Sequence, residues 1–348
     1  MVFILILLML MNILKRKQIG KKIMKLKSDY IIALLSLLLL LQISCKKEDN
    51  DTRSDGAIKL KINAKGSVQN PAWSPDNNYI VVTNFLNGYN TDPADIIIFD
   101  MNNETIIKLV ANGSANVNLT GSAWNGLIHK IVFSSSREPH DEVYMITETG
   151  TAGSEVKITE RSDKMAFEPS FSPDAAWIVF ESHITDVEGN GVITKYKTDK
   201  TSSYIELTGV NDDCRQPNWS PSGDLILYQK NENGQWDIWV MDTIGSNKSK
   251  VTSGKGDKTD ASFSPDGKYI VYSSNEGGEK YANIYIVPSV GGTSVRVTKS
   301  ESYDGAPSWS PDGKKIIFES SFYDPEKPTL WTPADPDGTK IWIINSPI

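Results

Sequence analysis

The amino-acid sequence predicts an all-β fold, a six-bladed β-propeller of four-stranded antiparallel blades, over residues 57–348. Two observations lead to this prediction. One short motif recurs at nearly constant spacing, and segments of strand length separated by turn residues fill the interval between its copies. A third observation concerns the ends: the last unit lacks a fourth strand, and an unassigned strand-like segment, AIKLKIN at 57–63, precedes the first.

The repeated motif is an aromatic residue followed by Ser, Pro and Asp and then by a short apolar run. Five copies are clear, and a sixth, AWNGLIHKIVF at 123–133, is degenerate. Successive copies are 51, 47, 48, 44 and 46 residues apart, which is the length of one propeller blade. The leading aromatic residues are Trp73, Trp124, Phe171, Trp219, Phe263 and Trp309.

Each unit divides into four strands in the same way. The first ends at the aromatic residue, and a turn follows in which Pro sets φ and Gly267 or Gly313 supplies a positive φ. The second and third strands are rich in β-branched and aromatic residues. The fourth is predicted from an apolar-X-apolar-Thr pattern, which recurs as VNLT, VKIT, IELT, SKVT and VRVT. The repeated Asp76, Asp174, Asp266 and Asp312 are interpreted as turn residues and not as a charged site.

The ends of the repeat array predict how the ring closes. The last unit stops after its third strand, IWIIN. We expect residues 57–63 to pair with that strand as the outer strand of the last blade, because an open blade would expose an unpaired edge.

These repeats resemble the PD40 (WD40-like) repeats of the TolB C-terminal propeller over nearly all of residues 57–348. The resemblance implies a propeller. It does not carry the TolB role, because we expect no separate N-terminal domain here, and the second unit has lost its Ser-Pro-Asp.

The N-terminal segment has the composition of a targeting signal. Residues 1–44 are predicted to be a signal peptide. Its predicted true start is Met24, which is followed by the basic Lys25 and Lys27 and by an apolar run up to Leu41. Cys45 is predicted to be the lipid-attachment site, and 45–56 a flexible tether. An uncleaved anchor or a general secretion signal is the alternative. We expect an outer-membrane lipoprotein of the cell envelope, facing the periplasm or the cell surface, whose membrane contact is its lipid.

The charge of the chain argues against nucleic acid as a partner. Residues 1–44 hold seven Lys/Arg and one Asp, so their removal changes the net charge from −7 to −13. Phosphate binding needs a cationic face instead. We expect a monomer with an acidic surface.

The loops between second and third strands, and the links between blades, are predicted to share one rim of the ring and to carry the binding face. They vary in length and chemistry, whereas the Ser-Pro-Asp turns of the other rim repeat. Aromatic residues and Arg are common interface anchors. The candidates on this rim are Phe85, Tyr89, Phe167, His183, Arg215, Tyr281, Tyr303, Asp304, Phe322, Tyr323 and Trp331. The alternative is that many of them pack loops onto the blades.

Catalytic and metal-binding motifs are not found in the sequence, which has three His residues. We therefore expect no catalysis, no metal and no cofactor, and we interpret Cys214 as a partly buried structural thiol, with a nucleophile as the alternative. The leading hypothesis is a lipid-anchored scaffold that binds an envelope protein or glycan. The alternatives are a polysaccharide lyase acting in the central channel, for which His183 and Arg215 would have to converge, and a TolB-like envelope-integrity factor.

Overall fold

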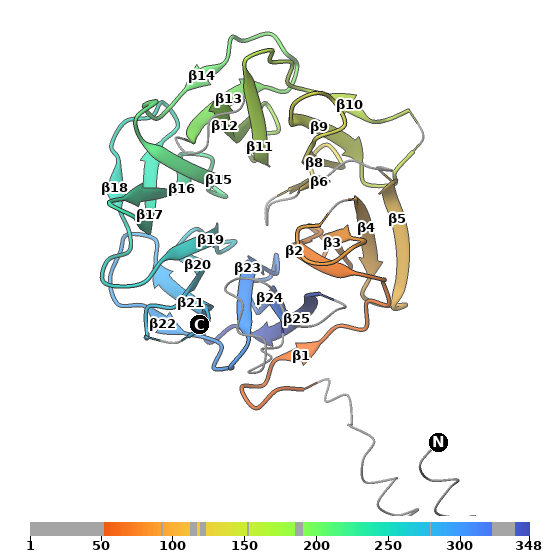
Figure 1. Cartoon of the computed structure of the whole chain (residues 1–348), viewed down its shortest axis with the longest axis vertical. Helices are drawn as coiled ribbons and strands as arrows, with labels where there is room; N and C mark the ends of the chain where they lie inside the picture. The colour runs from red at the N-terminus through yellow and green to blue at the C-terminus, as the bar shows by residue number, and fades with distance from the viewer. Residues whose placement is uncertain are drawn as a thin grey trace, which may run out of the picture. The chain divides into compact units, whose positions relative to one another are not determined.

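The computed structural model describes residues 52–91, 93–111, 117–118, 123–151, 153–184, 191–278, 280–321 and 338–348. They belong to one compact unit, Asp51–Ile348, in which six small sheets surround an axis (Figure 1). Within these residues every regular element is a strand, and no helix is long and apolar enough to span a membrane.

The first three blades are numbered from the first repeat. Blade 1 holds β2 (Ser67–Trp73), β3 (Tyr79–Phe85), β4 (Ala94–Asp100) and β5 (Thr105–Ala111). Blade 2 holds β6 (Val117–Asn118), β7 (Trp124–Asn125), β8 (Lys130–Ser135), β9 (Glu142–Thr147) and β10 (Val156–Lys157). Blade 3 holds β11 (Lys164–Phe171), β12 (Trp177–Ile184), β13 (Val192–Lys197) and β14 (Ile205–Glu206).

The other three blades repeat the order. Blade 4 holds β15 (Asp213–Trp219), β16 (Leu225–Glu232), β17 (Gln235–Asp242) and β18 (Ser249–Lys250). Blade 5 holds β19 (Lys258–Phe263), β20 (Tyr269–Ser274), β21 (Asn283–Pro288) and β22 (Val295–Arg296). Blade 6 holds β23 (Tyr303–Trp309), β24 (Lys315–Ser321), β25 (Lys340–Asn345) and β1 (Ile58–Lys59). The predicted six-bladed propeller of antiparallel blades is confirmed.

Blade 2 departs from the prediction. Its inner strand is in two pieces, β6 and β7, which both pair with β8. The VNLT segment, predicted as the fourth strand of blade 1, therefore contributes Val117 and Asn118 to the next blade, and that prediction was wrong. The fourth strand of blade 1 is β5, which directly follows a turn in which the Asp100 carboxylate accepts the N–H groups of Asn102 and Asn103.

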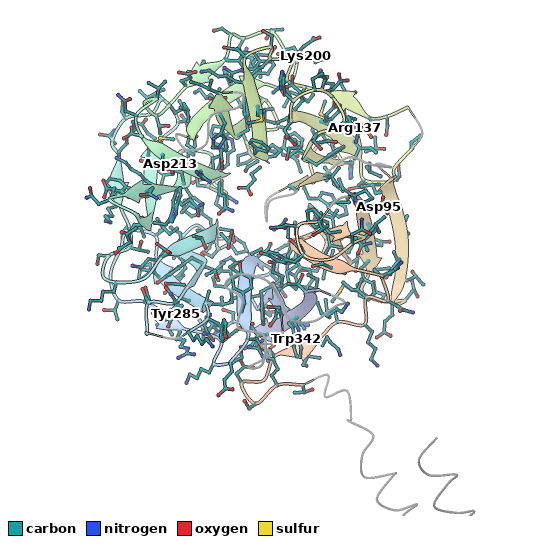
Figure 2. All side chains as sticks on the ribbon, viewed as in Figure 1. Asp95, Arg137, Lys200, Asp213, Tyr285 and Trp342 are labelled. Carbon is teal, nitrogen blue, oxygen red and sulfur yellow. The ribbon has the colours of Figure 1, made fainter. Side chains whose placement is uncertain are left out.

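The ring closes as predicted. Ile58 and Lys59 of β1 pair antiparallel with Ile343 and Trp342 of β25 (Trp342 is labelled in Figure 2). The strand is shorter than 57–63, because only two residues stay in register. The propeller also begins earlier than predicted, since Arg53, assigned to the tether, reaches into blade 6.

Arg53 fastens the start of the chain to the ring. Its guanidinium donates to both carboxylate oxygens of Asp304, at 2.8 and 2.9 Å, and lies 5.4 and 5.3 Å from the ring centres of Phe318 and Trp342. Asp304 is fully buried. A buried carboxylate needs such a partner, so this pair contributes to closure.

The Ser-Pro-Asp turns share one pattern of hydrogen bonds. In the first, the Ser74 hydroxyl donates to Asp76 at 2.6 Å and accepts the Tyr79 N–H at 2.8 Å, while Asp76 accepts the Asn78 N–H. The same bonds recur around Asp174, Asp266 and Asp312. The turn interpretation of the repeated Asp residues is confirmed.

A hydrogen bond explains the threonine that ends four of the five predicted fourth-strand patterns. Thr159, Thr208, Thr252 and Thr298 are buried, and each hydroxyl accepts the N–H of a residue at the start of the third strand, at 2.8–2.9 Å. The bond satisfies a buried backbone donor that the short fourth strand leaves without a ladder partner.

Candidate functional site: the variable rim at the channel mouth

The inner strands bring polar side chains to the axis of the ring. In β2, β11, β15, β19 and β23 the pairing register shifts in mid-strand, and one residue at each shift has a positive φ of 45–54° (Figure 1 shows these strands around the centre). These five residues line a small cavity of about 40 Å³ at the axis. They are Asn70, Glu168, Gln216, Asp260 and Ala306.

The hydrogen bonds explain the positive φ. At Asn70 and Gln216 it turns the backbone N–H toward the preceding blade, where a glutamate of the second strand accepts it. Glu319 accepts the Asn70 N–H at 3.0 Å, and Glu181 accepts the Gln216 N–H at 3.0 Å. Neighbouring blades are thus joined at the axis by polar contacts.

Three side chains form a continuous network across blades 3, 4 and 5. The Gln216 amide donates to Glu168 at 3.3 Å and to Asp260 at 2.8 Å, and its oxygen accepts the Asp260 N–H at 2.9 Å. Burial raises the pKa of Glu168 and of Asp260. Burial likewise raises the pKa of Glu319 to about 8, so this acid is neutral at pH 7.

On the side of blades 3 and 4, three predicted residues gather around Glu181. The Phe167 ring lies edge-on to His183, with 5.6 Å between ring centres, and His183 Nε2 pairs with the Glu181 carboxylate. Arg215 pairs with Asp213 at 3.0 Å and lies 5.0 Å from the ring centre of Trp236. Asp213 is the first residue of β15 and is labelled in Figure 2.

On the side of blades 1 and 6, Tyr89 meets Tyr303. The two phenols are hydrogen-bonded to each other, and Tyr89 also reaches Glu319. Gly88 and Asn90, with φ of 116° and 49°, flank Tyr89 and turn this loop inward. Burial raises the pKa of both tyrosines. Both therefore serve as hydrogen-bonding groups where blades 1 and 6 meet on the variable rim.

The remaining predicted residues lie elsewhere. Phe85 is 3% exposed and packs in the core between blades 1 and 2, and Asp304 is bound by Arg53, so neither lies on an open surface. Tyr281 is half-buried, with the Lys280 ammonium 5.3 Å from its ring centre. Cys45, Phe322, Tyr323 and Trp331 lie outside the described residues.

Cys214 is 1% exposed, and burial raises its pKa to about 12. A thiol with these properties is unreactive at neutral pH.

The axial acids and amides were not predicted from the sequence. The signal was present: a polar residue stands directly before Pro in three inner strands, at Asn70, Glu168 and Gln216. Because the residue before Pro is normally extended, nothing in the local pattern predicts a positive φ there.

Comparison with known proteins adds the family. The PD40 model, the TolB beta propeller domain, matches residues 151–324. The chain belongs to the TolB β-propeller family. The Tol-Pal system protein TolB of Francisella tularensis subsp. mediasiatica is 27% identical over 206 residues, which cover 56% of this chain and 43% of that protein. The match therefore spans less than half the length of that relative.

Solved structures agree on the fold of this TolB-family propeller. TolB from Acinetobacter baumannii has a TM-score of 0.56 and 18% identity, over 80% of this chain and 63% of that one. An oligogalacturonate lyase in complex with manganese has a TM-score of 0.55 and 12% identity, over 85% of this chain and 95% of that one. In the described part of the present chain, no group of three His, Cys, Asp or Glu could hold a metal ion.

Proposed function

We propose that this protein is a lipid-anchored binding module of the cell envelope. Its acylated Cys45 holds it at the outer membrane, and its variable rim binds an envelope protein at the channel mouth. The family supports an envelope role, since its matched relatives carry the name Tol-Pal system protein TolB. A glycan is the alternative partner.

One observation carries the proposal. Side chains from four blades come to the same rim around the axis: Tyr89 from blade 1, Phe167 from blade 3 packed on the buried His183, Arg215 from blade 4, and Tyr303 from blade 6. Aromatic residues and Arg held by neighbours lose little entropy when a partner packs on them.

The hydrogen-bond network at the axis makes the base of this surface rigid. The Glu319 and Glu181 bonds to the next blade fix the inner strands relative to one another. A rigid floor lowers the cost of ordering a partner segment.

The lyase alternative keeps one supporting observation. His183 and Arg215 approach the same carboxylate, Glu181, as that hypothesis requires. Absence of turnover on uronic-acid polymers by the detergent-solubilised chain would reject it. An envelope-integrity role like that of TolB is compatible with the binding module and differs in its partner.

A comparative pull-down tests the proposal. The detergent-solubilised chain is used to capture proteins from the envelope fraction of its host. Two double variants are compared with it. The first, Phe167→Ala with Arg215→Ala, changes the variable rim, and the second, Lys200→Ala with Lys268→Ala, changes the opposite rim, which carries the Ser-Pro-Asp turns and is called the turn rim. We expect one envelope protein to be retained by the wild type and by the turn-rim variant and lost by the first variant. Equal retention by all three, or retention of no envelope component, would reject the variable rim.

The anchor is tested separately. Cys45→Ser should abolish metabolic labelling with a radioactive fatty acid and release the protein from the membrane fraction. Unchanged labelling would assign the lipid elsewhere.

A further inference from the structure

We propose a second binding site, for a neutral sugar ring, in a groove between blades 1 and 2 on the turn rim. It goes beyond the proposed function and does not depend on it, because it lies on the opposite rim. The groove has a volume of about 400 Å³, within the range of small-molecule sites. The residues that line it and carry the argument are Tyr79, Trp124, His129, Glu148, Ile107 and Thr149.

The groove lies at blade 2, whose leading aromatic residue differs from those of the other five blades. Five of the six leading aromatic residues are buried, with 5–7% exposure, but Trp124 is half-buried. In the described residues the indole N–H groups of Trp73, Trp219 and Trp309 have no hydrogen-bond partner, whereas Trp124 donates to Glu148 at 2.9 Å. Blade 2 thus turns its aromatic residue toward the groove and fixes it there.

Glu148 holds a second side chain in the same groove. Its other carboxylate oxygen lies 2.8 Å from His129 Nδ1, and the His129 side chain is 72% exposed. One carboxylate therefore orients both an aromatic ring and an imidazole. Such a shared partner is typical of preorganised sites.

The backbone places His129 in the turn of blade 2. Trp124 pairs with Ile131 as Trp73 pairs with Ile80, so His129 occupies the place of Asn78 of blade 1. Its φ is 52°, in the left-handed region that His, Asn and Asp adopt more often than other residues with a side chain.

The loss of Ser-Pro-Asp in blade 2 shapes one wall. Gly126 stands where blade 1 has Pro75, and a Cβ at Gly126 would lie 2.7 Å from the Pro75 ring. The two blades therefore meet closely below the groove, and only Gly fits there.

The chemistry of the groove favours a neutral sugar. The faces of Tyr79 and Trp124, with Ile107 beside them, suit the C–H face of a pyranose ring. Asp76 is satisfied by Ser74 and Asn78, and Glu148 by Trp124 and His129, so the groove does not demand a charged ligand. The exposed imidazole edge is left to bond a sugar hydroxyl. The Thr149 hydroxyl, which bonds the hydroxyls of Thr151 at 2.8 Å and Thr147 at 3.3 Å, has capacity for one more hydrogen bond.

Binding is measured on the detergent-solubilised full chain, by saturation-transfer NMR and titration with methyl β-D-glucopyranoside and with N-acetyl-D-glucosamine. The variants are Tyr79→Ala, His129→Asn and a matched control, Tyr269→Ala, which changes the equivalent tyrosine of the groove between blades 5 and 6. Asn tolerates the positive φ, so His129→Asn should fold at least as stably as the wild type.

We expect at least one sugar to bind the wild type and Tyr269→Ala equally, and to bind Tyr79→Ala and His129→Asn about tenfold more weakly or worse. The proposal is overturned if neither sugar shows saturation transfer, or if all four proteins bind alike. The same measurements are made with benzyl alcohol and with methylguanidinium. Binding of either compound, with no binding of either sugar, would overturn the proposal of a sugar site and assign the groove to an apolar or cationic ligand.

Discussion

Replacing Glu319 by Gln should change how the stability of the propeller depends on pH. Glu319 lies on β24, is 2% exposed, and accepts the Asn70 N–H of the neighbouring blade. Gln has the same shape and keeps an oxygen for that N–H, but it cannot ionise. The substitution therefore isolates the contribution of the ionisation itself.

The magnitude follows from the pKa of this acid. Burial, with the nearby Asp260, raises the pKa of Glu319 from 4.5 to about 8. Between these values the folded state binds more protons than the unfolded state, so the free energy of unfolding falls as pH rises. The stabilisation is complete below pH 4.5 and lost above pH 8. At 1.36 kcal/mol per pKa unit, the contribution is about 5 kcal/mol.

The assay is urea unfolding of both proteins at a series of pH values from 4.5 to 9. Glu319→Gln should lose less stability than the wild type across this interval, by up to about 5 kcal/mol. The matched control is Glu301→Gln, an exposed acid of the same blade region, which should follow the wild-type profile. Parallel profiles for wild type and Glu319→Gln would refute the assignment of a neutral acid at the axis.

Three further predictions concern the closure, the repeat and the thiol. Arg53→Ala should lower the free energy of unfolding by about 3–5 kcal/mol, because it leaves Asp304 buried and without its guanidinium. Thr252→Val should cost about 1–3 kcal/mol, because the buried Ile238 N–H loses its acceptor; urea unfolding checks both. Cys214 should resist a thiol-specific reagent at pH 8 in the folded protein and react after unfolding, since burial raises its pKa to about 12.

Controls separate these effects from general damage. Arg296→Ala, at the outer strand of blade 5, and Thr201→Val, in an exposed turn, should each change stability by less than about 1 kcal/mol. An Arg53→Ala or Thr252→Val variant as stable as its control would contradict the role given to that side chain. Rapid labelling of Cys214 in the native protein would contradict its burial.

The sequence predicted the ring well because its repeats encode local structure. The Ser74 to Asp76 turn and the buried Thr298 are each fixed by bonds within one blade, so every copy of the motif reports the same geometry. Closure by β1 was predictable for the same reason, since the missing fourth strand and the orphan strand are complementary.

The candidate site was predicted only in part. Phe167, His183 and Arg215 share a rim with Tyr89 and Tyr303, as expected from loop positions. Phe85 was misplaced, because one residue of shift along a strand exchanges the surface for the core.

The axial network escaped prediction altogether. Its members, such as Gln216 and Asp260, are joined across blades, and their contacts depend on a positive φ that no local pattern indicates. The break at VNLT was missed because a chance match to the threonine pattern concealed the split inner strand of blade 2.

Site-specific photo-crosslinking in living cells tests the central functional claim most directly. The photo-reactive residue p-benzoylphenylalanine is placed at position 167 on the variable rim or at position 200 on the turn rim (Lys200 is labelled in Figure 2). We predict a discrete crosslinked envelope protein from position 167 and none of the same mass from position 200. The same crosslink from both positions, or from position 200 alone, would contradict it.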